Sequence, residues 1–108
     1  MIVKKPWGQE VIWAKTDKYV GKILNIEKGH ALSLQFHKLK DETIFLMCGQ
    51  MEFFYDGKTE TLTEGMTRHI EPLKHHRMIA LEDCMVLEVS TPELDDVVRL
   101  ADDYGRVT

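Results

Sequence analysis

Short runs of alternating apolar and polar residues, separated by turn residues, fill most of the chain between positions 10 and 91. In Ala31–His37, leucine and phenylalanine alternate with serine, glutamine and histidine, which is the period of a strand with one buried face. Asp56–Gly57 is a strong signal for a two-residue hairpin turn. The other predicted strands are Glu10–Ala14, Tyr19–Ile26, Glu42–Cys48, Met51–Tyr55, Lys58–Leu62, Thr67–Ile70, Arg77–Leu81 and Met85–Ser90. Short strands at this spacing predict an all-β sandwich or barrel.

The tail from Thr91 onward has a different pattern. Thr91, Pro92 and Glu93 suit the N-cap and first turn of a helix, and the apolar residues that follow fall roughly on one helical face. Val97 and Val98 suit a strand equally well. We therefore expect either a helical turn or an extended segment packed on the barrel.

Composition narrows the class of protein. At 108 residues, with 44% hydrophobic residues, the chain is expected to form one domain spanning residues 1–108. The net charge is −4, and acidic and basic residues are interspersed along the chain. A nucleic-acid-binding surface would instead show clustered Lys and Arg. No apolar run has the length of a membrane span, and the opening residues lack a secretory pattern. We expect a cytoplasmic protein that binds neither nucleic acid nor membrane, with Cys48 and Cys84 reduced and buried.

The candidate chemistry begins with Gln35 and His37, which lie two residues apart on a strand and project from one face. Glu42 opens the next strand, so a tight hairpin returns it beside His37. His76 ends a loop and opens a later strand, and an antiparallel barrel can bring all four to one interior point. Two imidazoles, a carboxylate and an amide oxygen can bind a divalent metal. On periodicity alone, an ordinary polar surface fits Gln35 and His37 as well.

The segment Gly29-x5-Gln35-x-His37-x4-Glu42-x6-Gly49 resembles the first cupin motif, with Gln35 where many cupins have histidine. The segment from Gly65 to Arg77 resembles the second motif, which places His76 at its last metal ligand. Cupins usually have proline at the position of Glu71 and glycine at that of Leu73. The resemblance implies a small double-stranded β-helix, or jelly-roll, barrel.

A narrower resemblance, to the phosphomannose isomerase cupin domain, covers nearly the whole chain. It is carried by Lys5-Pro6-Trp7-Gly8, Tyr19-Val20-Gly21-Lys22, Leu32-Ser33-Leu34-Gln35-x-His37, His76-Arg77 and Asp95-Asp96-Val97-Val98-Arg99-x3-Asp103-Tyr104-Gly105-Arg106. The tail motif is the most specific part, because other cupins lack it. The resemblance implies that Gln35, His37, Glu42 and His76 hold one divalent metal, with zinc expected first and manganese, iron, nickel or cobalt as alternatives. It also implies a homodimer.

Basic and acidic residues around this site have expected roles in moving a proton and holding a phosphate. Lys40, two residues before Glu42, is expected to bind phosphate or carry a proton. Arg99 and Arg106 are expected to clamp a phosphate, and Arg99 also to stabilise an enediolate, although either can pair with a neighbouring aspartate. Glu88 is a candidate base if it points inward, whereas simple strand alternation slightly favours an outward side chain.

These features predict a metal-dependent isomerase of a phosphorylated sugar, of the mannose 6-phosphate/fructose 6-phosphate type and acting through an enediol. Two alternatives stay open, since a fold does not fix a function. One is a non-catalytic cupin that binds a sugar or another small ligand. The other is a metal cupin of another reaction class, such as an iron oxygenase.

Overall fold

Eleven strands and no helix run through residues 1–107, which are the residues that the computed structural model describes. The strands are β1 (Ile2–Lys5), β2 (Gly8–Lys15), β3 (Val20–Ile26), β4 (Leu34–Phe36), β5 (Glu42–Cys48), β6 (Met51–Tyr55), β7 (Lys58–Leu62), β8 (Thr67–Ile70), β9 (His76–Ala80), β10 (Cys84–Ser90) and β11 (Val98–Ala101). Within this described range, no helix is long and apolar enough to cross a membrane.

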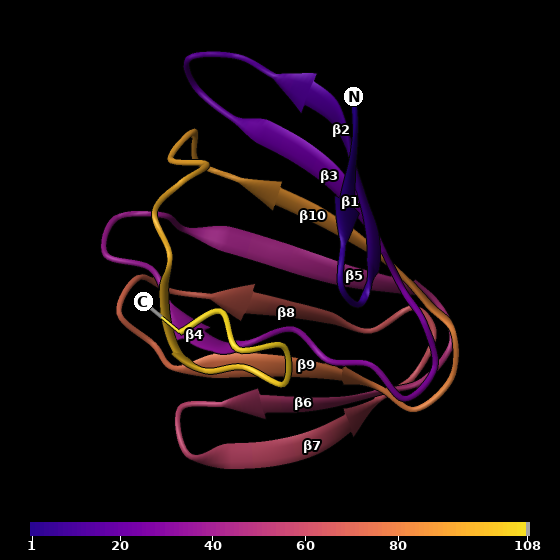
Figure 1. Ribbon diagram of the computed structural model, residues 1–108. Coiled ribbons are helices and arrows are strands. Elements are labelled where there is room, and N and C mark those ends of the chain that lie inside the picture. Colours follow the sequence, from indigo (N-terminus) through magenta and orange to yellow (C-terminus); the bar gives the residue numbers. More distant parts are fainter. Residues whose placement is uncertain (108) are drawn as a thin grey trace.

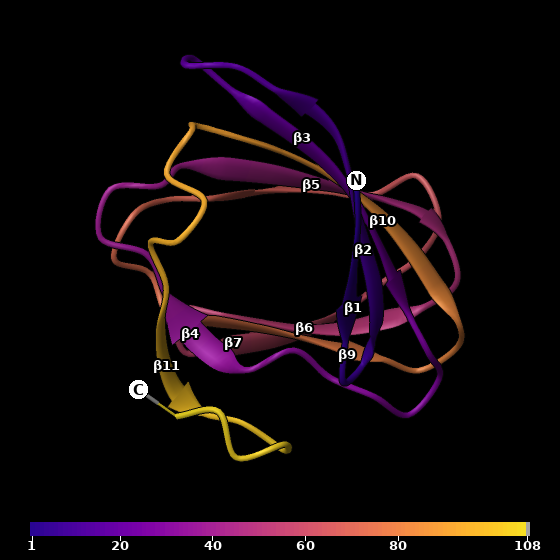
Figure 2. The ribbon, with the colours of Figure 1, turned by 45° about the horizontal axis from the view of Figure 1, so that its top comes forward.

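The strands form two antiparallel sheets that face each other as a cupin-like β-sandwich (Figures 1 and 2). The six-stranded sheet has the order β1-β2-β3-β10-β5-β8, and the five-stranded sheet has the order β11-β4-β9-β6-β7. Strands distant in sequence are neighbours, since β10 pairs with both β3 and β5. This topology brings residues near positions 22, 42 and 88 onto adjacent strands.

The inner face of the six-stranded sheet changes character along the strands. Every second residue of β3, of β10 and of the first five residues of β5 points inward and is buried. Toward one end of the sandwich these inward residues are apolar and belong to the core. Toward the other end, two positions away in each strand, the inward residue is charged. The apolar and charged positions are Leu24 and Lys22 in β3, Ile44 and Glu42 in β5, and Val86 and Glu88 in β10. The fold therefore has a packed apolar end and a charged end.

The expected strands are all present, and four of them have the predicted bounds. β4 is shorter than the predicted Ala31–His37, because Ala31 makes only an isolated bridge to Ile79 before the regular ladder begins. β1 was not predicted; it pairs with β2 at the edge of its sheet. Cys84 is buried as expected, whereas Cys48 is exposed, contrary to the prediction.

The tail forms a strand and not a helical turn. Residues 92–97 make tight local bonds, from the backbone N–H of Leu94 to the carbonyl of Pro92 and from that of Val97 to the carbonyl of Asp95. β11 then pairs with the free edge of β4, where Arg99 lies opposite Gln35. Pairing with an open sheet edge satisfies backbone groups that a short isolated helix would leave to water.

Candidate metal centre

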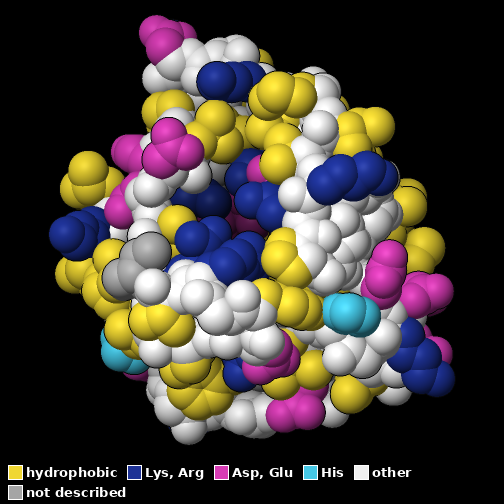
Figure 3. Space-filling model, viewed as in Figure 1, with side chains coloured by type: hydrophobic (Ala, Val, Ile, Leu, Met, Phe, Trp, Pro, Cys, Tyr) yellow, Lys and Arg dark blue, Asp and Glu magenta, His cyan; other side chains and the backbone are white. Residues whose placement is uncertain are grey.

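A cavity of about 390 Å³ opens between the sheets at the charged end of the sandwich. This volume lies within the usual range for sites that bind small molecules, roughly 300–1,000 Å³. Figure 3 shows the hollow, with lysine and arginine side chains gathered around it. Its basic lining residues are Lys5, Lys15, Lys22, Lys40, Arg99 and Arg106, and its acidic ones are Glu10, Glu42, Glu88 and Asp95. The rim is therefore more basic than the chain as a whole.

His37, Glu42 and His76 meet at one side of this cavity, and all three are buried. His37 follows β4, Glu42 opens β5 and His76 opens β9. Glu42 Oε1 lies 3.5 Å from Nε2 of both histidines. The three potential ligand atoms lie within 4.8 Å of one another. Two imidazoles and one carboxylate at this spacing form a donor set that suits a divalent transition metal.

Backbone carbonyl groups fix the tautomer of each histidine. His37 Nδ1 lies 2.6 Å from the carbonyl oxygen of Asp96, and His76 Nδ1 lies 2.9 Å from that of Lys74. A carbonyl oxygen only accepts, so both Nδ1 atoms carry the hydrogen and donate it. Burial lowers the pKa of His76, which favours its neutral form. His76 Nε2 is thereby left with a lone pair facing Glu42, which is the state that a metal ligand requires.

One atom of the triad tests whether the residues fit a metal. His76 Nε2 is buried and has no hydrogen-bond partner within residues 1–107. A buried polar atom left without a partner costs about 1–3 kcal/mol. A divalent ion between His37, Glu42 and His76 would satisfy this nitrogen. The triad therefore fits a metal ion, whose identity the donor set leaves open among several elements.

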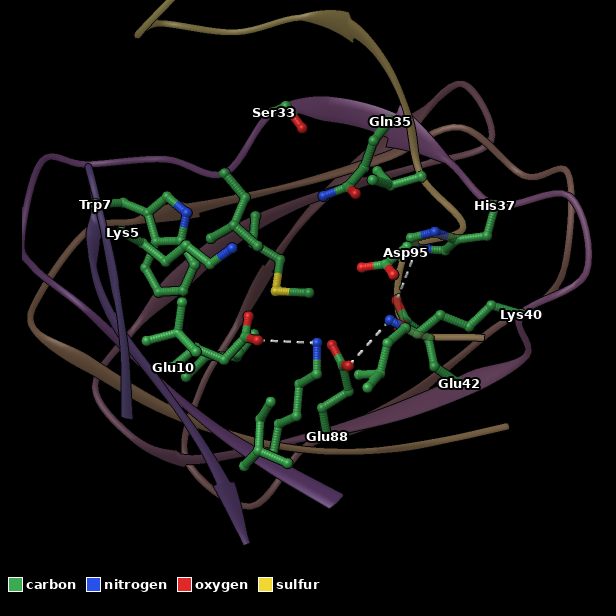
Figure 4. A pocket seen from close by; sticks show the side chains of 18 of the residues that line it. Lys5, Trp7, Glu10, Ser33, Gln35, His37, Lys40, Glu42, Glu88 and Asp95 are labelled. Atoms are coloured by element: carbon green, nitrogen blue, oxygen red, sulfur yellow. Dashed lines mark hydrogen bonds and ion pairs between the residues drawn. The ribbon is translucent and has the colours of Figure 1, made fainter. Parts of the chain in front are cut away.

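Gln35 lies beside the triad. It is the register partner of His76 in the β4–β9 ladder and lines the same cavity. Figure 4 shows its amide directed into that cavity. The role of Gln35 as a fourth metal ligand stays a prediction.

A buried ion-pair cluster adjoins the triad. Lys40 Nζ lies 3.0 Å from Glu42 Oε2 and 3.2 Å from Glu88 Oε2. Glu88 points inward, so the slight preference for an outward side chain was wrong. β10 lies in the middle of its sheet, and its even-numbered residues are buried between the two sheets. Apolar residues occur on both faces of β10, so the sequence pattern could not decide whether Glu88 points inward or outward.

These charges set the ionisation of the cluster. Burial by itself would lower the pKa of Lys40, but the carboxylates of Glu88 and Glu42 raise it above its usual range. Burial would likewise raise the pKa of Glu42, yet the contact with His37 and the ammonium of Lys40 lower it below its usual range. Burial, followed by the charge of Glu42, raises the pKa of Glu88. Glu88 is thus the more basic carboxylate, and Lys40 is an ammonium.

Asp96 holds the loop that carries these groups. Its carboxylate accepts hydrogen bonds from the backbone N–H groups of Lys38, Leu39 and Lys40, at 3.1, 2.7 and 2.9 Å. Burial would raise the pKa of Asp96, but these three donors lower it. From the sequence, Asp96 was expected only as part of the tail motif and as a possible partner of a tail arginine. Its place in the tail motif was the signal that could have found it.

The two arginines of the tail differ in their surroundings. Arg99 is half-buried, lines the cavity and has no ion-pair partner among residues 1–107. Arg106 also lines the cavity, but its Nε and Nη2 donate to the carboxylate of Asp102, each at 3.0 Å. The hydrogen bond from Arg106 lowers the pKa of Asp102 to about 2. Arg106 thus makes the aspartate pair that the sequence left open, while Arg99 remains available to a ligand.

The loop before His76 contains both departures from the second cupin motif, Glu71 and Leu73. Leu73 adopts a φ of 72°, in the left-handed region that favours glycine. Its N–H donates to the carbonyl of His37 at 2.6 Å. His75 is exposed and stacks on Phe36, while His76 is buried. The loop thus keeps the glycine-type conformation despite the leucine, and only the second histidine of the pair enters the cavity.

Comparison with known proteins gives two kinds of likeness. The model of the family "Mannose-6-phosphate isomerase C-terminal" matches residues 1–102. Mannose-1-phosphate guanylyltransferase of Escherichia coli K12 is 33% identical over 97% of this chain. The chain spans only 23% of the length of that relative.

The structural matches are remote in sequence. An RmlC-like cupin from Shewanella frigidimarina superposes with a TM-score of 0.80 over 88% of this chain and 86% of the other, at 14% identity. A sugar phosphate isomerase of the cupin superfamily from Silicibacter pomeroyi superposes with a TM-score of 0.69 over 77% of this chain and 58% of the other, at 15% identity. At these identities the likeness establishes the cupin fold.

Proposed function

The chain belongs to the mannose-6-phosphate isomerase C-terminal family of cupins, and from this premise we propose that it is a metal-dependent isomerase of a phosphorylated sugar. The proposed reaction interconverts mannose 6-phosphate and fructose 6-phosphate. One observation carries the proposal: the buried His37–Glu42–His76 triad shares a single cavity with the buried Lys40–Glu88 pair. A metal that polarises the oxygens and an acid–base pair that moves the protons can together carry out aldose–ketose isomerisation.

Gln35, His37, Glu42 and His76 would hold the ion, with zinc as the first expectation. Bound there, a divalent cation supplies Lewis acidity to the carbonyl and hydroxyl oxygens of the two reacting carbons. Lys40 already neutralises part of the Glu42 charge at 3.0 Å. The hydrogen bonds from Nδ1 of His37 and His76 to backbone carbonyls hold both imidazole rings in place. The two Nε2 atoms would therefore need little rearrangement to bind the metal.

Glu88 is the proposed base, because its raised pKa makes it a better proton acceptor than an exposed carboxylate. In the aldose-to-ketose direction it takes the proton from C2. The C2 electron pair forms the C1=C2 bond, and the former carbonyl oxygen O1 takes a proton from the Lys40 ammonium. Lys40 then recovers a proton from O2 as the C2 carbonyl forms, and Glu88 delivers its proton to C1. Both side chains end in their starting states.

Arg99 is the proposed phosphate ligand. It lies on β11, opposite Gln35, and so reaches the cavity from the edge of the five-stranded sheet. Its guanidinium can bind a phosphate through two parallel hydrogen bonds. The basic rim of the cavity favours the approach of an anion (Figure 3). Arg106 is the second proposed phosphate contact, although Asp102 already neutralises much of its charge.

The test is conversion of mannose 6-phosphate to fructose 6-phosphate by protein loaded in turn with zinc, manganese, cobalt and nickel. We expect turnover with at least one metal and its loss in Glu88→Gln. Glu82→Gln, an exposed glutamate on the surface, is the matched control and should retain activity. Binding of mannose 6-phosphate without turnover would instead support a non-catalytic sugar-binding cupin. Inactivity with a panel of hexose phosphates would exclude the isomerase.

A further inference from the structure

A second buried ion pair lines the cavity away from the triad. Lys22 Nζ lies 3.1 Å from Glu10 Oε1, and the two side chains are only 8% and 12% exposed. Glu10 is on β2 and Lys22 on β3, next to β10. Figure 4 shows Glu10 and Trp7 on one side of the cavity, His37 and Glu42 on the other, and Glu88 between them. The pair is thus a separate polar point within the same cavity.

The position of the pair follows from the register of the sheet. Lys22 lies directly opposite Glu88 in the β3–β10 ladder. The strands that carry Glu10 and Glu42, β2 and β5, are separated by three inter-strand spacings, roughly 14 Å. Glu10 lies opposite Leu24, and Glu42 lies opposite Ser90. The ionisable side chains therefore form a diagonal row across the inner face, from one wall of the cavity to the other. A ligand bound at the triad that extends along this row reaches Glu10 and Lys22.

Stability does not explain the pair. A buried ion pair is often no more stabilising than apolar residues of similar size. The next inward residues toward the core, Leu24 and Val86, are apolar and buried. Apolar residues at positions 10 and 22 would extend that core without interruption. The charges are therefore better explained by what they offer to the cavity.

The chemistry of the pair selects a neutral polar group. Lys22 and Glu10 cancel each other's charge, so the pair itself has no net charge to attract a second phosphate, although Lys5 lines the same end of the cavity (Figure 4). An ammonium has three donors and a carboxylate about four acceptor positions. Neither side chain has another hydrogen-bond or ion-pair partner within the described residues 1–107. A hydroxyl group both donates and accepts, so it can bind both members at once. The ring of Trp7 adds an apolar wall suited to the carbon side of a polyol.

We propose that Glu10 and Lys22 form a hydroxyl-recognition site, which binds the sugar hydroxyls beyond the reacting carbons while Arg99 takes the phosphate. This deepens the proposed function and rests on it for the class of ligand. The site would make the cavity selective for a polyhydroxylated chain over other phosphate-bearing molecules. Glu10 also orients Lys22, since the ion pair holds the ammonium at the cavity wall.

The test measures binding by the protein as purified, using calorimetry with sorbitol 6-phosphate and, separately, inorganic phosphate. Sorbitol 6-phosphate carries the hydroxyls but has no carbonyl, so no turnover is required. The variants are Lys22→Met and the double variant Glu10→Leu/Lys22→Met. The matched control is Lys18→Met, an exposed lysine in the preceding turn that undergoes the same change in charge. Thermal unfolding checks that each variant is folded.

We expect Lys22→Met and the double variant to bind sorbitol 6-phosphate at least about tenfold more weakly, because ligand hydroxyls lose buried partners. Inorganic phosphate should bind within about twofold of the wild-type affinity. If Lys22→Met fails to fold, the double variant is used alone, because removing both charges leaves no unpaired buried charge. Unchanged sorbitol 6-phosphate affinity in the double variant would overturn the proposal, as would an equal loss for both ligands or no wild-type preference for the polyol. A protein that shows the expected binding but never isomerises would overturn the proposed function alone.

Discussion

The backbone carbonyl of Asp96 accepts a hydrogen bond from Nδ1 of His37 at 2.6 Å, while the carboxylate of the same residue holds the backbone of residues 38–40. A residue of the tail thus fixes both a predicted metal ligand and the loop that carries Lys40. The tail therefore acts on the geometry of the candidate metal centre.

Asp96→Ala should weaken metal binding, because it releases the loop that orients His37. Loss of such a supporting contact typically lowers metal affinity by about 10–100-fold. Competition with a coloured chelator measures the affinity. Asp17→Ala, an exposed aspartate in a turn, is the control and should match the wild type. Equal affinities in Asp96→Ala and the control would show that His37 keeps its position without this support.

Lys40→Met should destabilise the metal-free protein, because it leaves the buried carboxylates of Glu42 and Glu88 without their shared cation. Breaking a buried ion pair by removing one partner costs about 3–5 kcal/mol in free energy of unfolding. Urea unfolding in the presence of a chelator measures this. Lys38→Met, two residues earlier and exposed, should change it little. A similar small effect at both positions would mean that Lys40 does not hold the two carboxylates.

Arg99→Gln should impair binding of the phosphorylated substrate without affecting stability, because Arg99 has no ion-pair partner among residues 1–107. We expect the KM for mannose 6-phosphate to rise roughly tenfold or more, as for loss of a charged hydrogen bond, at an unchanged melting temperature. Arg68→Gln, which affects an ion pair with Glu60 and a local backbone hydrogen bond away from the cavity, serves as the control. An unchanged KM in Arg99→Gln would mean that other basic residues bind the phosphate and that Arg99 does not.

The Asp102–Arg106 contact should stabilise the protein in a pH-dependent way. Its hydrogen bond from Arg106 lowers the pKa of Asp102 to about 2, below the ordinary value near 3.9. A carboxyl whose pKa is lowered on folding stabilises the native state above the unfolded pKa and loses that contribution as pH falls through the folded pKa. Wild type should therefore melt at a higher temperature than Asp102→Asn. This difference should be largest at pH 5 and above, and should shrink as the pH falls toward about 2. A gap that stays constant over this range would contradict the assignment.

The sequence was most informative where alternation and turn residues coincided. β5 to β8 have the predicted bounds because Gly49, Asp56–Gly57 and Gly65 mark their ends. The tail was ambiguous because valines suit a strand or a helix, and only the free edge of β4 decides between them. Pairing with a distant strand is a tertiary effect that no local pattern contains.

The site could be predicted only in part from the residues. Alternation placed Gln35 and His37 on one face, but the convergence of His76 with Glu42 depends on how β9 and β5 lie across the sandwich. Glu88 could not be oriented because both faces of β10 carry apolar residues. The backbone contacts of Asp96 depend on the folded loop and leave no periodic trace. The expected homodimer and cytoplasmic location stay predictions.

The most direct test of the central claim is the metal content of wild type, His76→Ala and His75→Ala, measured by elemental analysis after dialysis against a divalent metal. The two histidines are adjacent, but only His76 is buried in the triad, whereas His75 is exposed. We predict one metal ion per chain in wild type and His75→Ala, and loss of the ion in His76→Ala. Equal metal content in His76→Ala and wild type, or no metal in the wild type, would contradict the account.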